Sequence, residues 1–168
     1  MASARFAAAV WLLTAVLLQL GVVNRLHIPY GDPNLALVTV LSLALIEGPG
    51  LGMTAGFAAG LLGDLLGTHT IGRLALVWTL VGYAAGLART ETSRRGRNPI
   101  PPMVFVGVGT LVAALGYAGL AVVSGEAHAP VAQLARLSLV TAAYDVLLTP
   151  LLYPVLRALL IRLDPTAP

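Results

Sequence analysis

The sequence predicts an all-α integral membrane protein of about six transmembrane helices, because of its composition and the spacing of its apolar segments. Of its 168 residues, 58% are hydrophobic and only 10% are charged, whereas soluble domains carry about 25% charged residues. Such a chain lacks the polar residues needed to cover a soluble core. Its 18 glycines lie mostly within apolar stretches, where membrane helices tolerate them well. We expect one transmembrane helical-bundle domain over residues 1–168.

Turn residues divide the chain into six apolar segments. The predicted helices cover residues 5–24, 33–46, 51–66, 73–88, 100–123 and 130–162. The first begins like a signal peptide, but about 18 apolar residues without a small-x-small cleavage site indicate a retained span. The second and third reach only about 20–24 Å, against about 30 Å of hydrocarbon, so we predict a hairpin whose tip lies partly in the membrane.

Local residues predict where several helices begin and bend. Asp32 is the expected N-cap of the second helix, with Pro33 at its first helical position. A threonine of the loop at 67–72 is expected to cap the fourth helix. Pro150 and Pro154 predict a kink in the last helix.

The arginines predict the orientation of the chain. With the N-terminus in the cytoplasm, seven arginines fall inside and three outside, a positive-inside bias that also places the C-terminus inside. The arginine-rich loop at 89–98 lies between two apolar segments without interleaved aromatics, so it indicates a cytoplasmic loop and not a nucleic-acid site. The inner set is Arg5, Arg89, Arg94, Arg95, Arg97, Arg157 and Arg162, and the outer set is Arg25, Arg73 and Arg136.

Glycines spaced four apart form a row of small residues. Residues at i and i+4 share a helix face, and small faces let helix backbones approach closely in lipid. Internal packing of the bundle is the main interpretation, and docking of a partner's helix is the alternative. The row comprises Gly48, Gly52, Gly56 and Gly60, with Gly82 and Gly86 on the fourth predicted helix.

Two carboxylates lie inside predicted spans, where acids are costly and tend to mark function. Asp64 follows the glycine row and is expected to pair with Arg73 across the loop, with a functional role as the alternative. Asp145 lies nearer the membrane centre, where Pro150 leaves the carbonyl of Val146 without its helical donor. A structural, hydrogen-bonded acid and a functional one are equally compatible with that position.

Nothing in the sequence predicts an enzyme, a cofactor or a metal site. The chain has no cysteine, and its three histidines fall in separate predicted loops without the spacing of metal ligands. No Ser/His/Asp arrangement, phosphate-binding loop or carboxylate pair suited to hydrolysis is present.

The order of these motifs resembles MreD, the family of bacterial rod shape-determining membrane proteins. The resemblance covers essentially the whole chain, although the loop at 89–102 is richer in Arg and Pro than the family's pattern. It rests on the turn Asp32-Pro33-Asn34, on Gly52, Gly56, Phe57, Gly60 and Asp64, and on the following Gly72, Gly82 and Gly86.

The resemblance implies a non-enzymatic scaffold of the bacterial elongasome in the inner membrane, which supports rod shape and lateral peptidoglycan synthesis. The implied partner is an MreC-like single-span (bitopic) membrane protein, working alongside MreB, RodA and a class B penicillin-binding transpeptidase. The family also resembles the substrate-binding subunits of energy-coupling-factor transporters, so a vitamin-transporter subunit is the alternative function. The partner-binding face, a homodimer and a membrane lipid within the bundle all stay open.

Overall fold

The computed structural model describes residues 2–21, 32–67, 71–90, 98, 100–125 and 131–163. Within these residues the regular structure is entirely helical, which confirms the predicted all-α class. The bounds lie within a few residues of those expected from the sequence. The helices are α1 (Ala2–Gly21), α2 (Leu35–Glu47), α3 (Pro49–Leu66), α4 (Arg73–Leu87), α6 (Ile100–Val123) and α7 (Val131–Leu163).

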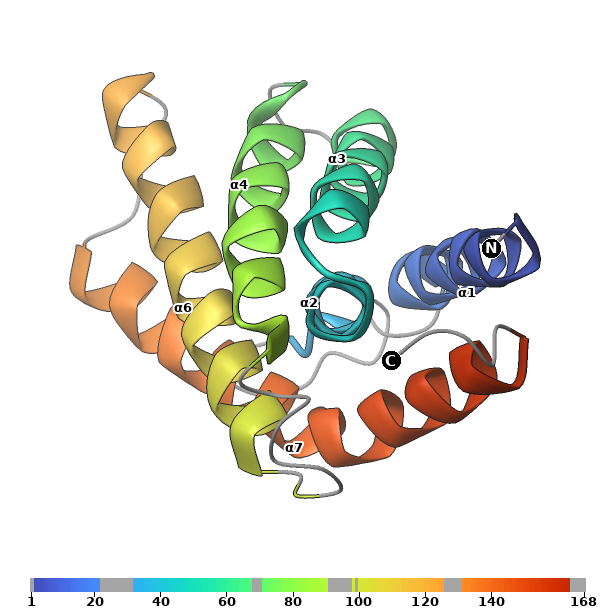
Figure 1. Cartoon of the computed structure of the whole chain (residues 1–168). Helices are drawn as coiled ribbons and strands as arrows, with labels where there is room; N and C mark the ends of the chain where they lie inside the picture. The colour runs from blue at the N-terminus through green and yellow to red at the C-terminus, as the bar shows by residue number, and fades with distance from the viewer. Residues whose placement is uncertain are drawn as a thin grey trace.

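The short helix α2 forms the centre of the bundle. Figure 1 shows α2 nearly end-on, and α1, α3, α4, α6 and α7 all contact it. Every residue from Ala36 to Ile46 is buried. A helix that is apolar on all sides is stable only when other helices surround it or lipid does. The neighbouring helices therefore provide the environment that the sequence of α2 requires.

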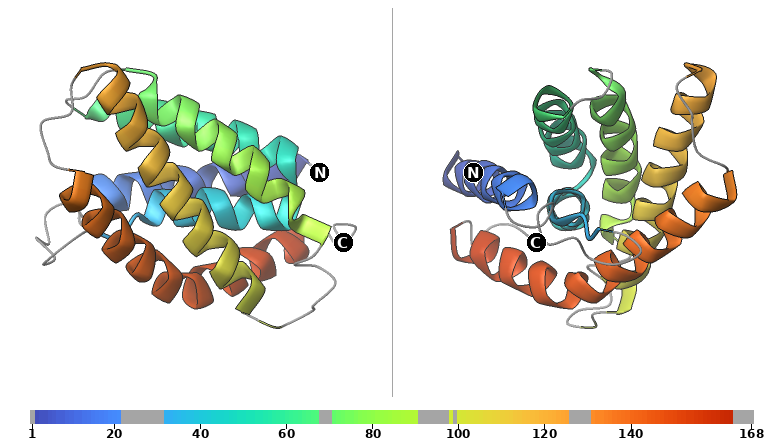
Figure 2. Two further views of the ribbon diagram at one scale, coloured as in Figure 1. Left: turned by 90° about the vertical axis from the view of Figure 1, so that its left-hand side faces the viewer. Right: turned by 180° about the vertical axis from the view of Figure 1, so that it is seen from behind.

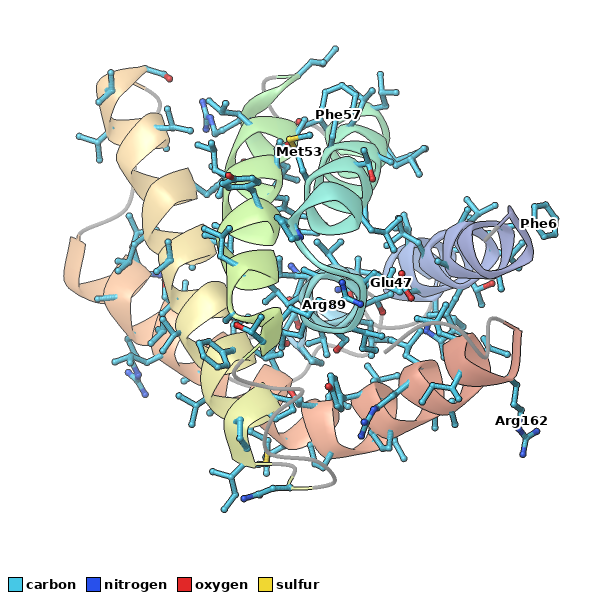
Figure 3. The ribbon with its side chains drawn as sticks, viewed as in Figure 1. Phe6, Glu47, Met53, Phe57, Arg89 and Arg162 are labelled. Atoms are coloured by element: carbon cyan, nitrogen blue, oxygen red, sulfur yellow. The ribbon has the colours of Figure 1, made fainter. Side chains whose placement is uncertain are left out.

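The outer surface of the bundle is apolar, and polar side chains lie inside it. On α6, Ile100, Val104, Val108 and Val112 recur every four residues, and each is more than half exposed. Figure 3 shows Phe6 projecting outwards from α1. Large exposed apolar surfaces combined with buried polar groups are typical of a protein surrounded by lipid. The buried polar set is Thr39, Ser42, Asp64, Arg73, Thr110, Ser138, Asp145 and Thr149.

Helix lengths fall into two groups. Among the described residues, Ile100–Val123 and Gln133–Arg162 are long and apolar enough to cross a membrane. The stretch Phe6–Gln19 and the helices α2 and α4 are apolar but shorter. Only Gly48 separates α2 from α3, and its φ of +99° is accessible to glycine at little cost. This residue lets the chain reverse direction without a loop.

The long helix α7 bends around one side of the bundle. Figures 1 and 2 show its curvature, and Pro150 and Pro154 lie inside it. Because proline has no N–H, Pro150 cannot donate to the carbonyl of Val146, and its ring crowds the preceding turn. The hydroxyl of Thr149 donates to the carbonyl of Asp145 at 2.7 Å. The bend therefore coincides with a polar stretch that faces the bundle interior.

Candidate functional site

The carboxylate of Asp145 connects α7 to two other elements. The side chain is fully buried. Its Oδ1 accepts a hydrogen bond from the backbone N–H of Asn34 at 2.7 Å. Its Oδ2 accepts one from the hydroxyl of Thr110, on α6, at 2.8 Å. Asp145 thereby links the start of α2, the middle of α6 and the bend of α7.

Two further side chains bind the same helix start. Asn34 is the N-cap of α2, and its side-chain oxygen accepts from the N–H of Leu37 at 3.0 Å. Gln19, on α1, accepts from the N–H of Leu35 at 2.8 Å, and its amide nitrogen donates to the carbonyl of Pro33 at 3.0 Å. The first N–H groups of a helix lack partners within the helix. We call Gln19, Asn34, Thr110 and Asp145 the α2 clamp, because Gln19, Asn34 and Asp145 accept from N–H groups at the start of α2 and Thr110 donates to Asp145.

The predicted N-cap of α2 was wrong by two residues. Asp32 is exposed and Pro33 is buried ahead of the helix, which begins at Leu35. A capping side chain bonds to an N–H two or three residues further on, and Asn34 does this with Leu37. The turn Asp32-Pro33-Asn34 therefore positions its third residue as the cap.

Sequence reasoning missed Gln19 and Thr110. Gln19 is a carboxamide near the end of a long apolar stretch, and Thr110 is a hydroxyl in the apolar helix α6. Such side chains in membrane helices tend to form interhelical hydrogen bonds, so both carried a usable signal. Their partners could not be named from the sequence. Gln19 bonds to the backbone of Pro33 and Leu35, and Thr110 bonds to the carboxylate of Asp145 on another helix.

Asp64 performs a similar capping role for α4. Its carboxylate, on α3, is 1% exposed. It accepts from the N–H groups of Gly72 at 2.9 Å, Leu74 at 3.1 Å and Ala75 at 3.1 Å. The N-cap Gly72 has no side chain to do this, and a carboxylate at a helix N-terminus also interacts favourably with the helix dipole. The threonines expected to cap α4, at 68 and 70, lie outside the described residues.

Arg73 lies at the same end of α4 and faces α6. It is the first residue of α4 and is 8% exposed. Its guanidinium carbon lies 5.2 Å from the centroid of the Tyr117 ring on α6, within the range of a cation–π contact. The hydrogen bonds described for Asp64 come from backbone amides, so the pairing of Asp64 with Arg73 stays a prediction. Asp64 links α3 to α4, and Arg73 links α4 to α6.

The glycine row lies between α3 and α4, which run side by side in Figure 1. A Cβ atom at Gly56 would lie 2.6 Å from the carbonyl carbon of Trp78. One at Gly60 would lie 2.6 Å from the Cα of Ala75. Real Cβ atoms do not approach other atoms this closely, so only glycine permits the observed spacing. Because α4 covers this face, a partner's helix cannot also lie on it.

The remaining glycines of the row belong to the same interface. A Cβ at Gly82 would lie 2.9 Å from the carbonyl carbon of Gly52, so these two backbones are in direct contact. A Cβ at Gly86 would lie 2.6 Å from the carbonyl carbon of Gly48. A Cβ at Gly48 would lie 3.4 Å from the Cδ of Arg89. Arg89 is the first residue of the arginine-rich loop at 89–98 and one of the few of that loop that are described. Close backbone contact thus runs the length of the α3–α4 pair.

The buried polar groups of the site are engaged in hydrogen bonds between helices. Among the described residues, no group of three or more His, Cys, Asp or Glu side chains could hold a metal ion. The histidines at 27, 69 and 128 lie outside those residues. Both buried carboxylates accept two or more hydrogen bonds from helix starts or a hydroxyl. Their evident effect is to fix the relative positions of five helices.

The fold and these contacts define an all-helical membrane protein whose buried polar groups fasten its helices together. Comparison with known families makes the assignment specific. The chain belongs to the MreD family: the family described as rod shape-determining protein MreD matches residues 4–163, nearly the whole chain. This confirms the resemblance seen in the sequence and supports a role in determining rod shape. No curated protein and no solved structure matches the chain.

Proposed function

We propose that the chain is a non-enzymatic scaffold in the bacterial inner membrane, which supports rod shape and lateral peptidoglycan synthesis by binding an MreC-like single-span protein. The carrying observation is that Asp64 and Asp145, the two buried carboxylates among the described residues, both accept hydrogen bonds from the start of a helix. A protein built in this way presents fixed helix faces to a partner. Membership of a rod shape-determining family supports the same role.

The proposed topology has all six helices within the membrane and both termini in the cytoplasm. The apolar outer surface and the distribution of arginines support this arrangement. Helix α2, with 13 residues, is too short to span about 30 Å of hydrocarbon. Its start can lie within the membrane because the α2 clamp satisfies the backbone groups there, as a low-dielectric surrounding requires.

The partner is proposed to bind an outer helix face within the bilayer. The glycine face of α3 is covered by α4, so it is not available. Exposed apolar rows remain on α1, α6 and α7, including Val104, Val108 and Val112 on α6 and Leu147 and Leu151 on α7. MreB, RodA and a class B penicillin-binding transpeptidase are proposed to join the same assembly through that partner or beside it.

A mild-detergent affinity pull-down from native membranes tests the proposal, with the eluate analysed for both proteins and small molecules. Recovery of an MreC-like single-span protein, with wall-synthesis enzymes and no bound solute, supports the scaffold. Recovery of an ATPase module or a stoichiometric vitamin overturns it in favour of a transporter subunit. Alanine at Val104, Val108 and Val112, compared with alanine at Leu147 and Leu151, tests which face the partner uses.

A further inference from the structure

An apolar groove runs inwards from the outer surface between α1 and α3. Its volume is about 140 Å³. Ala9 and Ala58 are exposed at its mouth, and Leu43 of α2 is buried at its base. The groove therefore reaches from the surface to the central helix. Its full lining is Ala8, Ala9 and Leu12 from α1, Leu43 from α2, and Leu51, Thr54, Ala55 and Ala58 from α3.

The lining offers no group that would bind a polar ligand. Its only polar side chain is Thr54, whose hydroxyl donates to the carbonyls of Gly50 and Leu51, each at 3.1 Å. A bound water needs two to four polar partners, and this lining does not provide them. An empty groove would forfeit the dispersion contacts of its walls. The occupant that fits these walls is a hydrocarbon.

The size of the groove selects a single chain over a helix. One turn of a helix, about 10 Å wide and 5.4 Å high, occupies roughly 400 Å³. A cavity of about 150 Å³ accommodates a molecule the size of benzene, with six carbons. The groove, at about 140 Å³, therefore matches a short length of one hydrocarbon chain, whereas a helix could place only a side chain in it.

The groove opens where the protein faces hydrocarbon. Ala9 on α1 and Ala58 on α3 line the groove and are exposed. The outer surfaces of the same two helices carry large exposed apolar side chains, Phe6 at 71% and Phe57 at 53%, and Figure 3 shows Phe6 projecting outwards. In a bilayer, the molecules that meet this surface are the acyl chains of phospholipids.

We propose that this groove binds one acyl chain of a membrane phospholipid, inserted between α1 and α3 against Leu43. The inference rests on the membrane placement proposed above and not on the scaffold role. The bound chain fills the space left by the four alanines and packs α1 against the rest of the bundle. Gln19 holds the C-terminal end of α1, and the lipid chain holds its middle.

Photo-crosslinking in lipid nanodiscs tests the proposal. The full-length protein is reconstituted with phosphatidylcholine and phosphatidylglycerol and a tracer phospholipid that carries a diazirine in its acyl chain. Mass spectrometry then locates the labelled residues. We expect labelling of residues 8–12 and 51–58 to exceed several-fold that of the exposed row at Val104, Val108 and Val112. Ala58→Phe, which fills the mouth, should reduce groove labelling to the level of α6.

Ala84→Phe is the matched control, because Ala84 is exposed on α4 outside the groove. It should leave groove labelling unchanged. Even labelling around the whole perimeter, or an equal loss in both variants, overturns the lipid site. An absence of labelling anywhere overturns the membrane placement as well. A benzoyl-phenylalanine in place of Ala58 that captures a polypeptide in native membranes, and no lipid, assigns the groove to a partner's helix instead.

Discussion

The backbone N–H of Asn34 donates to the carboxylate of Asp145 at 2.7 Å, across 111 positions of sequence. The second oxygen of Asp145 accepts from Thr110, so one side chain joins the start of α2 to α6 and α7. The two donors differ in kind: an amide can only donate, whereas a hydroxyl can also accept. This difference determines how substitutions at Asp145 behave.

Asp145→Asn should be mild and Asp145→Leu severe. The asparagine oxygen keeps the bond from Asn34, and its NH₂ group can donate to the Thr110 hydroxyl after that hydroxyl turns. Leucine leaves both donors buried and without an acceptor at this site, at about 1–3 kcal/mol each. Thermal unfolding of the purified variants in detergent measures the difference. Equal loss of function in both variants, with stability retained by the asparagine form, would show that the charge itself is required.

Asp64→Asn should destabilise the protein more than Asp145→Asn. The donors to Asp64 are the backbone N–H groups of Gly72, Leu74 and Ala75, and none of them can accept. An asparagine NH₂ group would face at least one of them, at a cost of about 1–3 kcal/mol. Unfolding temperatures of the two variants provide the comparison. Asp32→Asn, at an exposed position, is the control, and the reverse order would contradict the assigned contacts.

Even the smallest enlargement at Gly56 should separate α3 from α4. A Cβ there would lie 2.6 Å from a backbone carbon of Trp78, which cannot rotate away as a side chain could. Overpacking typically costs about 1–3 kcal/mol, and we expect Gly56→Ala at the upper end and Gly56→Leu or Gly60→Leu to prevent assembly of the bundle. The unfolding temperature reports this loss.

Gly119→Ala is the matched control, because a Cβ at Gly119 would meet nothing within 4 Å. It should leave the unfolding temperature close to that of the wild type. Wild-type stability of Gly56→Ala, or an equal loss in both variants, would mean that α3 and α4 do not pack as described.

Both Gln19→Leu and Gln19→Glu should loosen the start of α2. Leucine removes both hydrogen bonds, and glutamate keeps the acceptor for Leu35 but places a second oxygen against the carbonyl of Pro33. Hydrogen exchange at the amide of Leu35 measures the change, with faster exchange expected in both variants. Thr14→Ala is the control, since the Thr14 hydroxyl bonds only within α1, to Val10. Unchanged hydrogen exchange at Leu35 in Gln19→Leu would show that Gln19 does not stabilise the start of α2.

Ser42→Ala should be neutral or stabilising. Ser42 is fully buried on α2, and its hydroxyl is the buried side-chain atom without a hydrogen-bond partner among the described residues. Removing an unsatisfied buried hydroxyl relieves a cost of about 1–3 kcal/mol. Thermal unfolding and complementation of cell shape are measured together. Loss of rod shape with unchanged stability would assign the Ser42 hydroxyl a functional contact.

The helices were predictable because their signals are local. Proline and glycine near Gly48 and Pro49 mark the α2–α3 turn, and the four-residue spacing of Gly52, Gly56 and Gly60 placed these glycines on one face. The sequence did not predict which surface packs against this glycine face. That surface is the backbone of Trp78 and Ala75, and its position depends on the register between α3 and α4.

The contacts of the buried acids could not be read from the sequence. A charged residue suggests a charged partner, so Arg73 was the natural expectation for Asp64. The fold supplies backbone amides to Asp64, and every residue type except proline carries a backbone N–H, so no sequence pattern marks these donors. The bond between Asp145 and Asn34 spans most of the chain, beyond the reach of any local rule.

The long separation between Asn34 and Asp145 also bears on how the chain is made. A ribosome completes α2 well before it adds Asp145, so α2 is made while one of the acceptors at its start is still missing. Gln19, already present, can hold the helix start in the meantime. The hydrogen bond from Asn34 can form only after α7 has been made. A chain that ends before position 145 lacks this acceptor at the start of α2. The capping of α2 is therefore completed only after α7 has been made.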